Sequence, residues 1–210
     1  MKFGKTLFAS VALAASLGAQ AQVTGSLGGG SGSFLLLSSP AICTAVTPCT
    51  LTGVVNGSIV GGTILNSDQP FADIPKGAIA GGNFLSAGPT TTQDSTIQFD
   101  SGLSYVSFLW GSPDLYNALT VKTSAGDFAF TAAGLGFSVT NGDQSFSQYV
   151  QFSADAGVTI KGLVFSNSPV VDAFEVANFN VTAVPEPETY VLMLAGLGAV
   201  GFMNRRRRKA

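Results

Sequence analysis

Apolar residues recur at every second position through the body of the chain, and this alternation constrains the fold more than any other feature. In residues 103–110, Val106, Phe108 and Trp110 fall on one face, opposite Tyr105, Ser107 and Leu109. The same period recurs in residues 118–123, 127–131, 158–165 and 173–182, with a phase shift near Ala177 and Asn178 that indicates a bulge. Turn pairs such as Ala125-Gly126 and Asn141-Gly142 separate the segments, so the pattern predicts an antiparallel sheet.

Several of these segments are apolar on both faces, which a single sheet exposed to water would not tolerate. Thirteen phenylalanines lie between residues 22 and 184, and two packed sheets would bury them. We therefore expect an all-β fold, an antiparallel, jelly-roll-like β-sandwich over residues 53–183.

The N-terminal 21 residues have the three parts of a secretory signal peptide. Lys2 and Lys5 precede an apolar run over residues 6–17, and Ala19 and Ala21 form a small-x-small site for signal peptidase. A short buried helix is the alternative. The sequence therefore predicts an exported chain that begins near Gln22.

Residues 22–52 are rich in Gly and Ser, and we expect a flexible leader there. Cys43 and Cys49 lie within this segment. An even cysteine count in an exported protein predicts a disulfide that closes a small loop. A redox or metal site is the alternative, but the CxxC spacing and further ligands are missing.

The C-terminal residues 184–210 combine three features in a fixed order. Pro185, Glu186 and Pro187 come first, an uncharged stretch over residues 189–203 follows, and the chain then has a basic run. The stretch predicts a single, rather short transmembrane helix. The basic run is expected to stop transfer and remain cytoplasmic, and it consists of Arg205, Arg206, Arg207 and Arg208. A plain tail anchor is the alternative.

This order of features resembles the PEP-CTERM sorting signal of exosortase substrates in Gram-negative bacteria. The resemblance implies a transient intermediate in the inner membrane, from which exosortase removes the tail. It also implies that the body reaches the cell surface or the extracellular space. Exosortase and signal peptidase are then the processing partners, and the motif is a substrate segment with no catalytic role.

Charge and composition exclude several other functions. Between residues 23 and 184, three lysines face ten acidic residues, a net charge of −7 that is unsuited to nucleic acid. Histidine is absent, which excludes imidazole-based triads and histidine-ligated metals. We expect no cofactor and no metal site, although Asp-rich turns leave calcium open.

One local block is a candidate for glycan contact. The residues in question are Trp110, Asp114, Tyr116 and Asn117, since aromatic rings stack on pyranoses and polar groups bind their hydroxyls. The alternative is that Trp110 lies in the core while Asp114 and Asn117 satisfy a turn.

This block and residues 172–178 resemble segments of β-sandwich surface proteins that depend on exosortase. The expected patterns are Trp-Gly-Ser-x-Asp-x-Tyr-Asn and Asn-Ala-Phe-Glu-x-Asp-Asn. The second pattern is altered here, because Asp172 replaces Asn and Ala177 replaces Asp.

The function expected from these features is a structural one without catalytic residues, in the surface layer or the exopolysaccharide matrix of a biofilm. A carbohydrate-binding module that uses Trp110 and Tyr116 is the alternative. A glycoside hydrolase would need Glu175 and a second carboxylate, and the sequence nominates no such partner.

Overall fold

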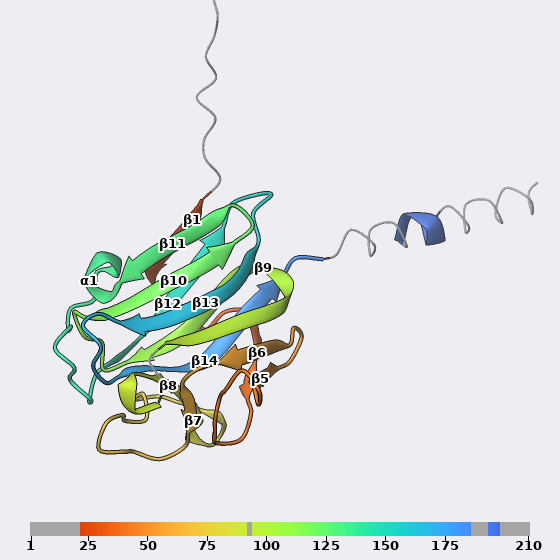
Figure 1. Ribbon diagram of the computed structural model, residues 1–210. Helices are drawn as coiled ribbons and strands as arrows, with labels where there is room; N and C mark the ends of the chain where they lie inside the picture. The colour runs from red at the N-terminus through yellow and green to blue at the C-terminus, as the bar shows by residue number, and fades with distance from the viewer. Residues whose placement is uncertain (1–21, 92–93, 186–192, 198–210) are drawn as a thin grey trace, which may run out of the picture.

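The structure is a computed structural model that describes residues 22–91, 94–185 and 193–197. Within these residues, strands account for almost all regular structure (Figure 1). The short strands of the first half are β1 (Val23–Leu27), β2 (Ser33–Phe34), β3 (Leu36–Leu37), β4 (Ala41–Ile42), β5 (Cys49–Thr52), β6 (Gly57–Val60), β7 (Thr63–Leu65) and β8 (Phe84–Ala87). The longer strands are β9 (Ser95–Gly111), β10 (Asn117–Thr123), β11 (Gly126–Thr131), β12 (Ser147–Ala154), β13 (Ile160–Asn167) and β14 (Phe174–Ala183). The one-turn helix α1 (Ala132–Leu135) and two 3₁₀ turns (Ala80–Gly82 and Pro89–Thr91) complete the described elements.

Strand β9 organises the fold, because its two halves have different partners. Residues 95–103 of β9 pair with β13 and β6, and residues 103–111 pair with β12 and β14. One group of strands therefore runs β11-β10-β13-β9-β6-β5-β3. The other group runs β1-β12-β9-β14-β8-β7-β4, with β2 also on β14. Every pairing between these strands is antiparallel.

Aromatic side chains fill the space between the two groups. The ring of Phe108 on β9 lies 5.5 Å from Phe165 on β13 and 5.6 Å from Phe179 on β14, measured between centroids. Phe130 on β11 contacts Phe152 on β12 at 4.9 Å. Burial of each such side chain stabilises the fold by about 1.5–3 kcal/mol, so these contacts hold the two groups of strands together.

The predicted all-β, antiparallel fold is confirmed, and the jelly-roll-like sandwich class stays a prediction. The bulge is also confirmed, because the pairing of β14 with β9 shifts register between Ala177 and Asn180. Asn178 there has a φ of 54°, and its side chain reaches across to the segment between β7 and β8.

The flexible leader expected over residues 22–52 is not what the structure shows. Strand β1 pairs with β12 from Val23 opposite Ala154 to Leu27 opposite Val150. Gly25 sits beneath aromatic rings, since a Cβ atom there would lie 2.8 Å from both Phe130 and Phe152. Glycine in this segment therefore permits close packing and does not mark a flexible linker.

Cys43 and Cys49 form a disulfide in this N-terminal region. Both cysteines are buried, and the loop between them joins β4 to β5. The bond therefore ties the exposed strand β4 to β5, whose Leu51 is buried in the core.

The predicted signal peptide, with Ala19 and Ala21, lies outside the described residues. Glu186, Pro187 and Arg205–Arg208 lie outside them as well, and of the predicted helix 189–203 only residues 193–197 are described, in helical conformation. Among the described residues, no helix has the length and apolar character needed to cross a membrane.

Candidate functional site

The two blocks of residues that the sequence singled out lie side by side in the structure. Strand β9 ends in the first block and β14 begins in the second, and the register places Glu175 opposite Gly111 and Val176 opposite Trp110. Tyr116 reinforces the pairing, because its hydroxyl donates a 2.7 Å hydrogen bond to the backbone carbonyl of Asp172. The blocks thus form one local structure.

Trp110 belongs to the core of this structure, so the glycan contact predicted for it is wrong. Its side chain has no exposed surface, and its ring stacks on Phe174 with centroids 4.3 Å apart. Phe137 meets the same ring edge-on at 5.2 Å. The inward face of β9 continues to its end, as the alternative interpretation of Trp110 required.

Asn117 is also unable to contact a glycan, because it is fully buried. Its amide nitrogen donates to Asn167 Oδ1 at 2.9 Å, and its own oxygen accepts from the backbone amide of Asp114 at 2.7 Å. Asn117 therefore holds the turn between β9 and β10.

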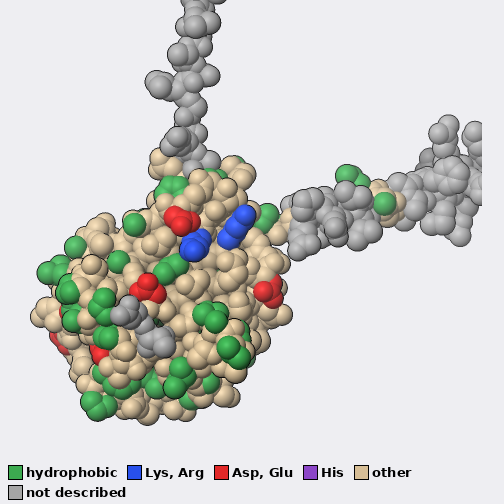
Figure 2. All heavy atoms as spheres, viewed as in Figure 1, with side chains coloured by type: hydrophobic (Ala, Val, Ile, Leu, Met, Phe, Trp, Pro, Cys, Tyr) green, Lys and Arg blue, Asp and Glu red, His purple; other side chains and the backbone are tan. Residues whose placement is uncertain are grey.

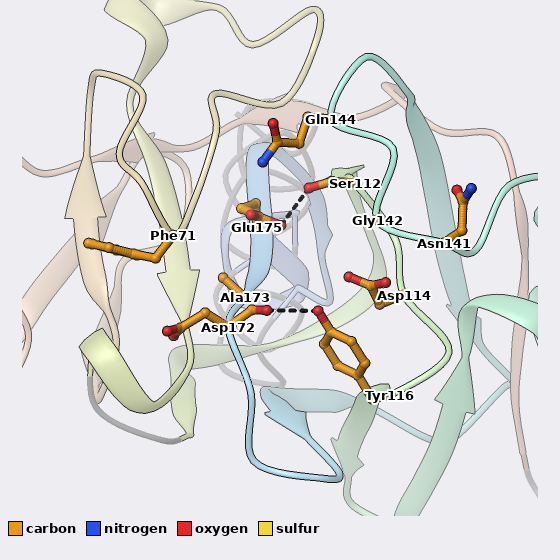
Figure 3. A pocket seen from close by; sticks show the side chains of 10 residues that line it. All are labelled: Phe71, Ser112, Asp114, Tyr116, Asn141, Gly142, Gln144, Asp172, Ala173 and Glu175. Carbon is orange, nitrogen blue, oxygen red and sulfur yellow. Dashed lines mark hydrogen bonds between the residues drawn. The ribbon is translucent and has the colours of Figure 1, made fainter.

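Asp114 and Tyr116, in contrast, line a cavity of about 240 Å³ (Figure 3). Ser112, Gln144 and Glu175 border the same space. Figure 3 shows the carboxyl group of Asp114, the hydroxyl of Tyr116 and the amide of Gln144 directed toward it. The remaining lining residues are Phe71, Asn141, Gly142, Asp172 and Ala173.

Glu175 forms the floor of this cavity and is only 3% exposed. Ser112 donates a 2.8 Å hydrogen bond to its Oε2. Burial raises the pKa of Glu175 to about 8, although hydrogen bonds from Ser112 and from backbone amides oppose the rise. At neutral pH this side chain is therefore mostly a carboxylic acid, able to donate a hydrogen bond.

The segment between β7 and β8 causes much of this burial. Its residues Ala72, Phe71 and Ile74 pack on Ala173 and Ala177 of the β14 region, on the face opposite the main core. A Cβ atom on Gly111 would lie 2.9 Å from Pro75 of the same segment. Glu175 thus lies between the sheet and a covering segment.

Asp114 is half-buried, and the loss of solvent raises the pKa of its carboxyl group, while the neighbouring Tyr116 phenol lowers it. Burial, and then the nearby carboxyl groups of Asp114, Glu175 and Asp172, raise the pKa of the Tyr116 phenol, so it keeps its proton. Gly142 forms one side of the cavity. Its backbone lies close to Asp114, since a Cβ atom at this position would lie 2.9 Å from Asp114 Oδ1.

The cavity therefore combines the carboxyl groups of Glu175, Asp114 and Asp172 with a phenol and amides. Among the residues that the structure describes, no lysine or arginine lines it. Among the described residues, no three His, Cys, Asp or Glu side chains are grouped so as to hold a metal ion.

Sequence reasoning missed Ser112 and Gln144. Ser112 lies inside the first block, but only the register of β9 with β14 shows that it faces Glu175. Gln144 follows the Asn141-Gly142 pair. That pair predicted a turn, but it did not indicate that the turn lies beside Asp114.

The comparisons with known proteins concern the end of the chain. Residues 183–208 match the family model of the PEP-CTERM protein-sorting motif. The chain thus carries a PEP-CTERM sorting motif at residues 183–208, as its Pro-Glu-Pro segment predicted. The motif implies processing by exosortase and export through a membrane-anchored sorting intermediate to the surface. No curated protein and no solved structure matches the chain.

Proposed function

We propose that the chain is a non-catalytic structural protein of the bacterial surface or of the exopolysaccharide matrix of a biofilm. In this proposal signal peptidase removes residues 1–21, the inner membrane holds the C-terminal helix transiently, and exosortase releases a β-sandwich body.

The junction between the body and the sorting motif carries this proposal. Strand β14 pairs with β9 to its last residue, where Ala183 lies opposite Leu103. The backbone amide of Val184 then donates a 2.9 Å hydrogen bond to Gly102, and Pro185 follows immediately. Cleavage beyond Val184 would therefore leave the sheet with all its described strands, as a protein that acts after release requires.

The surface and the disulfide agree with a passive role outside the cytoplasm. Figure 2 shows a face on which few side chains are charged. Such a surface offers hydroxyl groups to polysaccharide, and the negative net charge of the body opposes its self-association. The disulfide between Cys43 and Cys49 is suited to an oxidising compartment.

Cell fractionation with intact-mass measurement tests the localisation and the processing of the protein together. The wild-type strain should yield a surface or extracellular form that begins near Gln22 and lacks Arg205–Arg208. A strain without exosortase should retain an uncut form in the inner membrane. The variant Glu186→Ala should also accumulate uncut in the inner membrane. Glu188→Ala lies just outside the Pro-Glu-Pro segment and is the matched control, which should be processed like the wild type. A wild-type mass that still contains the arginines would refute the processing.

A glycoside hydrolase is the second candidate, because one observation favours it. Glu175, whose pKa is raised to about 8, lies in the same cavity as the Asp114 carboxyl group, and glycosidases pair an acid with a carboxylate. Hydrolysis of a chromogenic glycoside that Glu175→Gln abolishes would replace the non-catalytic proposal. We expect no turnover by the wild type.

A further inference from the structure

The cavity beside Asp114 has the size and the chemistry of a small binding site. Its volume of about 240 Å³ lies below the roughly 300–1,000 Å³ of pockets for drug-sized ligands, so it fits a single ring better than an oligomer. The turn after β9, the start of β14 and the loop around Gly142 each supply part of its wall. Hydrogen bonds hold this wall in place, as those of Tyr116 with Asp172 and of Asn117 with Asp114 show.

The lining offers both hydrogen-bond acceptors and hydrogen-bond donors. The carboxyl group of Asp114 accepts hydrogen bonds, and the amide of Gln144 and the acid of Glu175 can donate them. Glu175 is the anchor of the arrangement, because it is 97% removed from solvent and fixed by Ser112. A ligand with several adjacent hydroxyl groups satisfies such a mixture, since each hydroxyl both donates and accepts.

The acidic lining selects against anionic ligands. A phosphate, a sulfate or a uronic acid would meet Asp114 without any lysine or arginine to balance it. A bound metal ion would need a ligand group that the described residues do not provide. Among uncharged ligands, a polyhydroxylated ring matches this mixture of donors and acceptors.

We propose that this cavity binds one neutral sugar residue, with Asp114 and Gln144 contacting its hydroxyl groups and Ser112 and Glu175 forming the floor. The identity of that sugar as part of a matrix polysaccharide rests on the proposed surface function. The binding itself does not, because it is a property of the purified protein. The site differs from the one that the sequence predicted, since Trp110 and Asn117 lie outside it.

Saturation-transfer NMR and calorimetry with the purified full chain test this proposal, in a detergent without a sugar headgroup. The probes are the methyl glycosides of glucose, galactose and mannose, with glucosamine and glucuronic acid as charged comparisons. At least one neutral glycoside should bind at millimolar concentration and should bind better than glucuronic acid. Asp114→Asn should weaken that binding about tenfold, because it removes a charged acceptor but keeps the shape.

Two further variants separate loss of the site from loss of the fold. Gln144→Ala truncates an exposed side chain at the rim, so it should weaken binding severalfold while the melting temperature stays unchanged. Asp127→Asn makes the same chemical change as Asp114→Asn on exposed β11 and should bind like the wild type. The proposal fails if no neutral glycoside binds, if only a charged sugar binds, or if Asp114→Asn and Gln144→Ala bind normally. Fractionation of the native protein judges the surface function separately.

Discussion

The hydroxyl of Ser112 donates a 2.8 Å hydrogen bond to the buried carboxyl group of Glu175. This bond connects the end of β9 to the start of β14, two segments that are 63 positions apart in the chain. It also ties the stability of the sheet to the protonation of one side chain, and the first prediction follows from that link.

Glu175→Gln should change how stability depends on pH. Burial raises the pKa of Glu175 in the folded chain to about 8 from its ordinary value of 4.5. The folded chain therefore binds the proton of Glu175 more tightly than the unfolded chain does. The resulting contribution to the free energy of unfolding is complete below about pH 4.5 and is lost as the pH rises to about 8. Glutamine stays neutral and retains an acceptor for Ser112, so the variant should gain stability relative to wild type across this window. Thermal melts from pH 4 to pH 9 measure the difference, and parallel curves would contradict it.

Trp110→Ala should destabilise the fold by about 3–5 kcal/mol, because it removes a large, fully buried side chain and leaves a cavity beside Phe174. Trp110→Phe should cost less, since a ring remains in contact with Phe174. The matched control is Leu115→Ala, five residues later, where the side chain is 71% exposed and the change should stay within about 0.5 kcal/mol. Denaturant titrations give the three values, and a mild effect of Trp110→Ala would show that the ring is not in the core.

Removal of the disulfide by the double variant Cys43→Ser and Cys49→Ser should lower the free energy of unfolding by about 2 kcal/mol, as expected for a short closed loop. A reductant should destabilise the wild type to a similar extent and leave the double variant unaffected. Chemical denaturation with and without reductant makes this comparison. An effect of reductant on the double variant would assign the loss to something other than this bond.

Replacement of Asn178 should loosen the segment between β7 and β8. The Asn178 side chain accepts from the amide of Ile79 and donates to the carbonyl of Gly77, both at 2.9 Å. Asn178→Ala and Asn178→Gly should both speed hydrogen exchange at Ile79. Asn178→Ala should also lower the free energy of unfolding by about 1 kcal/mol more than Asn178→Gly. The φ angle is 54° at this position, a conformation that glycine adopts more readily than alanine. Unchanged exchange in both variants would refute this anchoring role.

Most strands of the second half were predictable because their apolar period is regular. Residues 118–123 and 127–131 lie in β10 and β11 close to the expected bounds, and residues 103–110 form the second half of β9, whereas β12 was not predicted. The first half of β9 was not foreseen, because Asp100, Ser101 and Gly102 interrupt its apolar pattern. Pairing with β6 and β13 holds that half in the sheet in spite of the local sequence.

The N-terminal strands were missed for a similar reason. Glycine and serine usually indicate a flexible segment, but Gly25 packs against Phe130 and Phe152 from distant strands. Composition alone cannot reveal such a contact. The same limit applies to the cavity, since the sequence singled out Asp114 and Tyr116 in one candidate and Glu175 in another but did not show that the three share one space.

The hydrogen bond of Val184 to Gly102 has a mechanical consequence. A pull on the chain beyond Val184 acts along the axis of β14, whose ladder with β9 extends from Ala183 to Glu175. The hydrogen bonds between antiparallel strands lie perpendicular to the strands, so a load along β14 is a shear that many of these bonds resist together. A peeling force would instead break them one after another. The end of the domain that leads into the sorting motif thus resists tension through many hydrogen bonds at once.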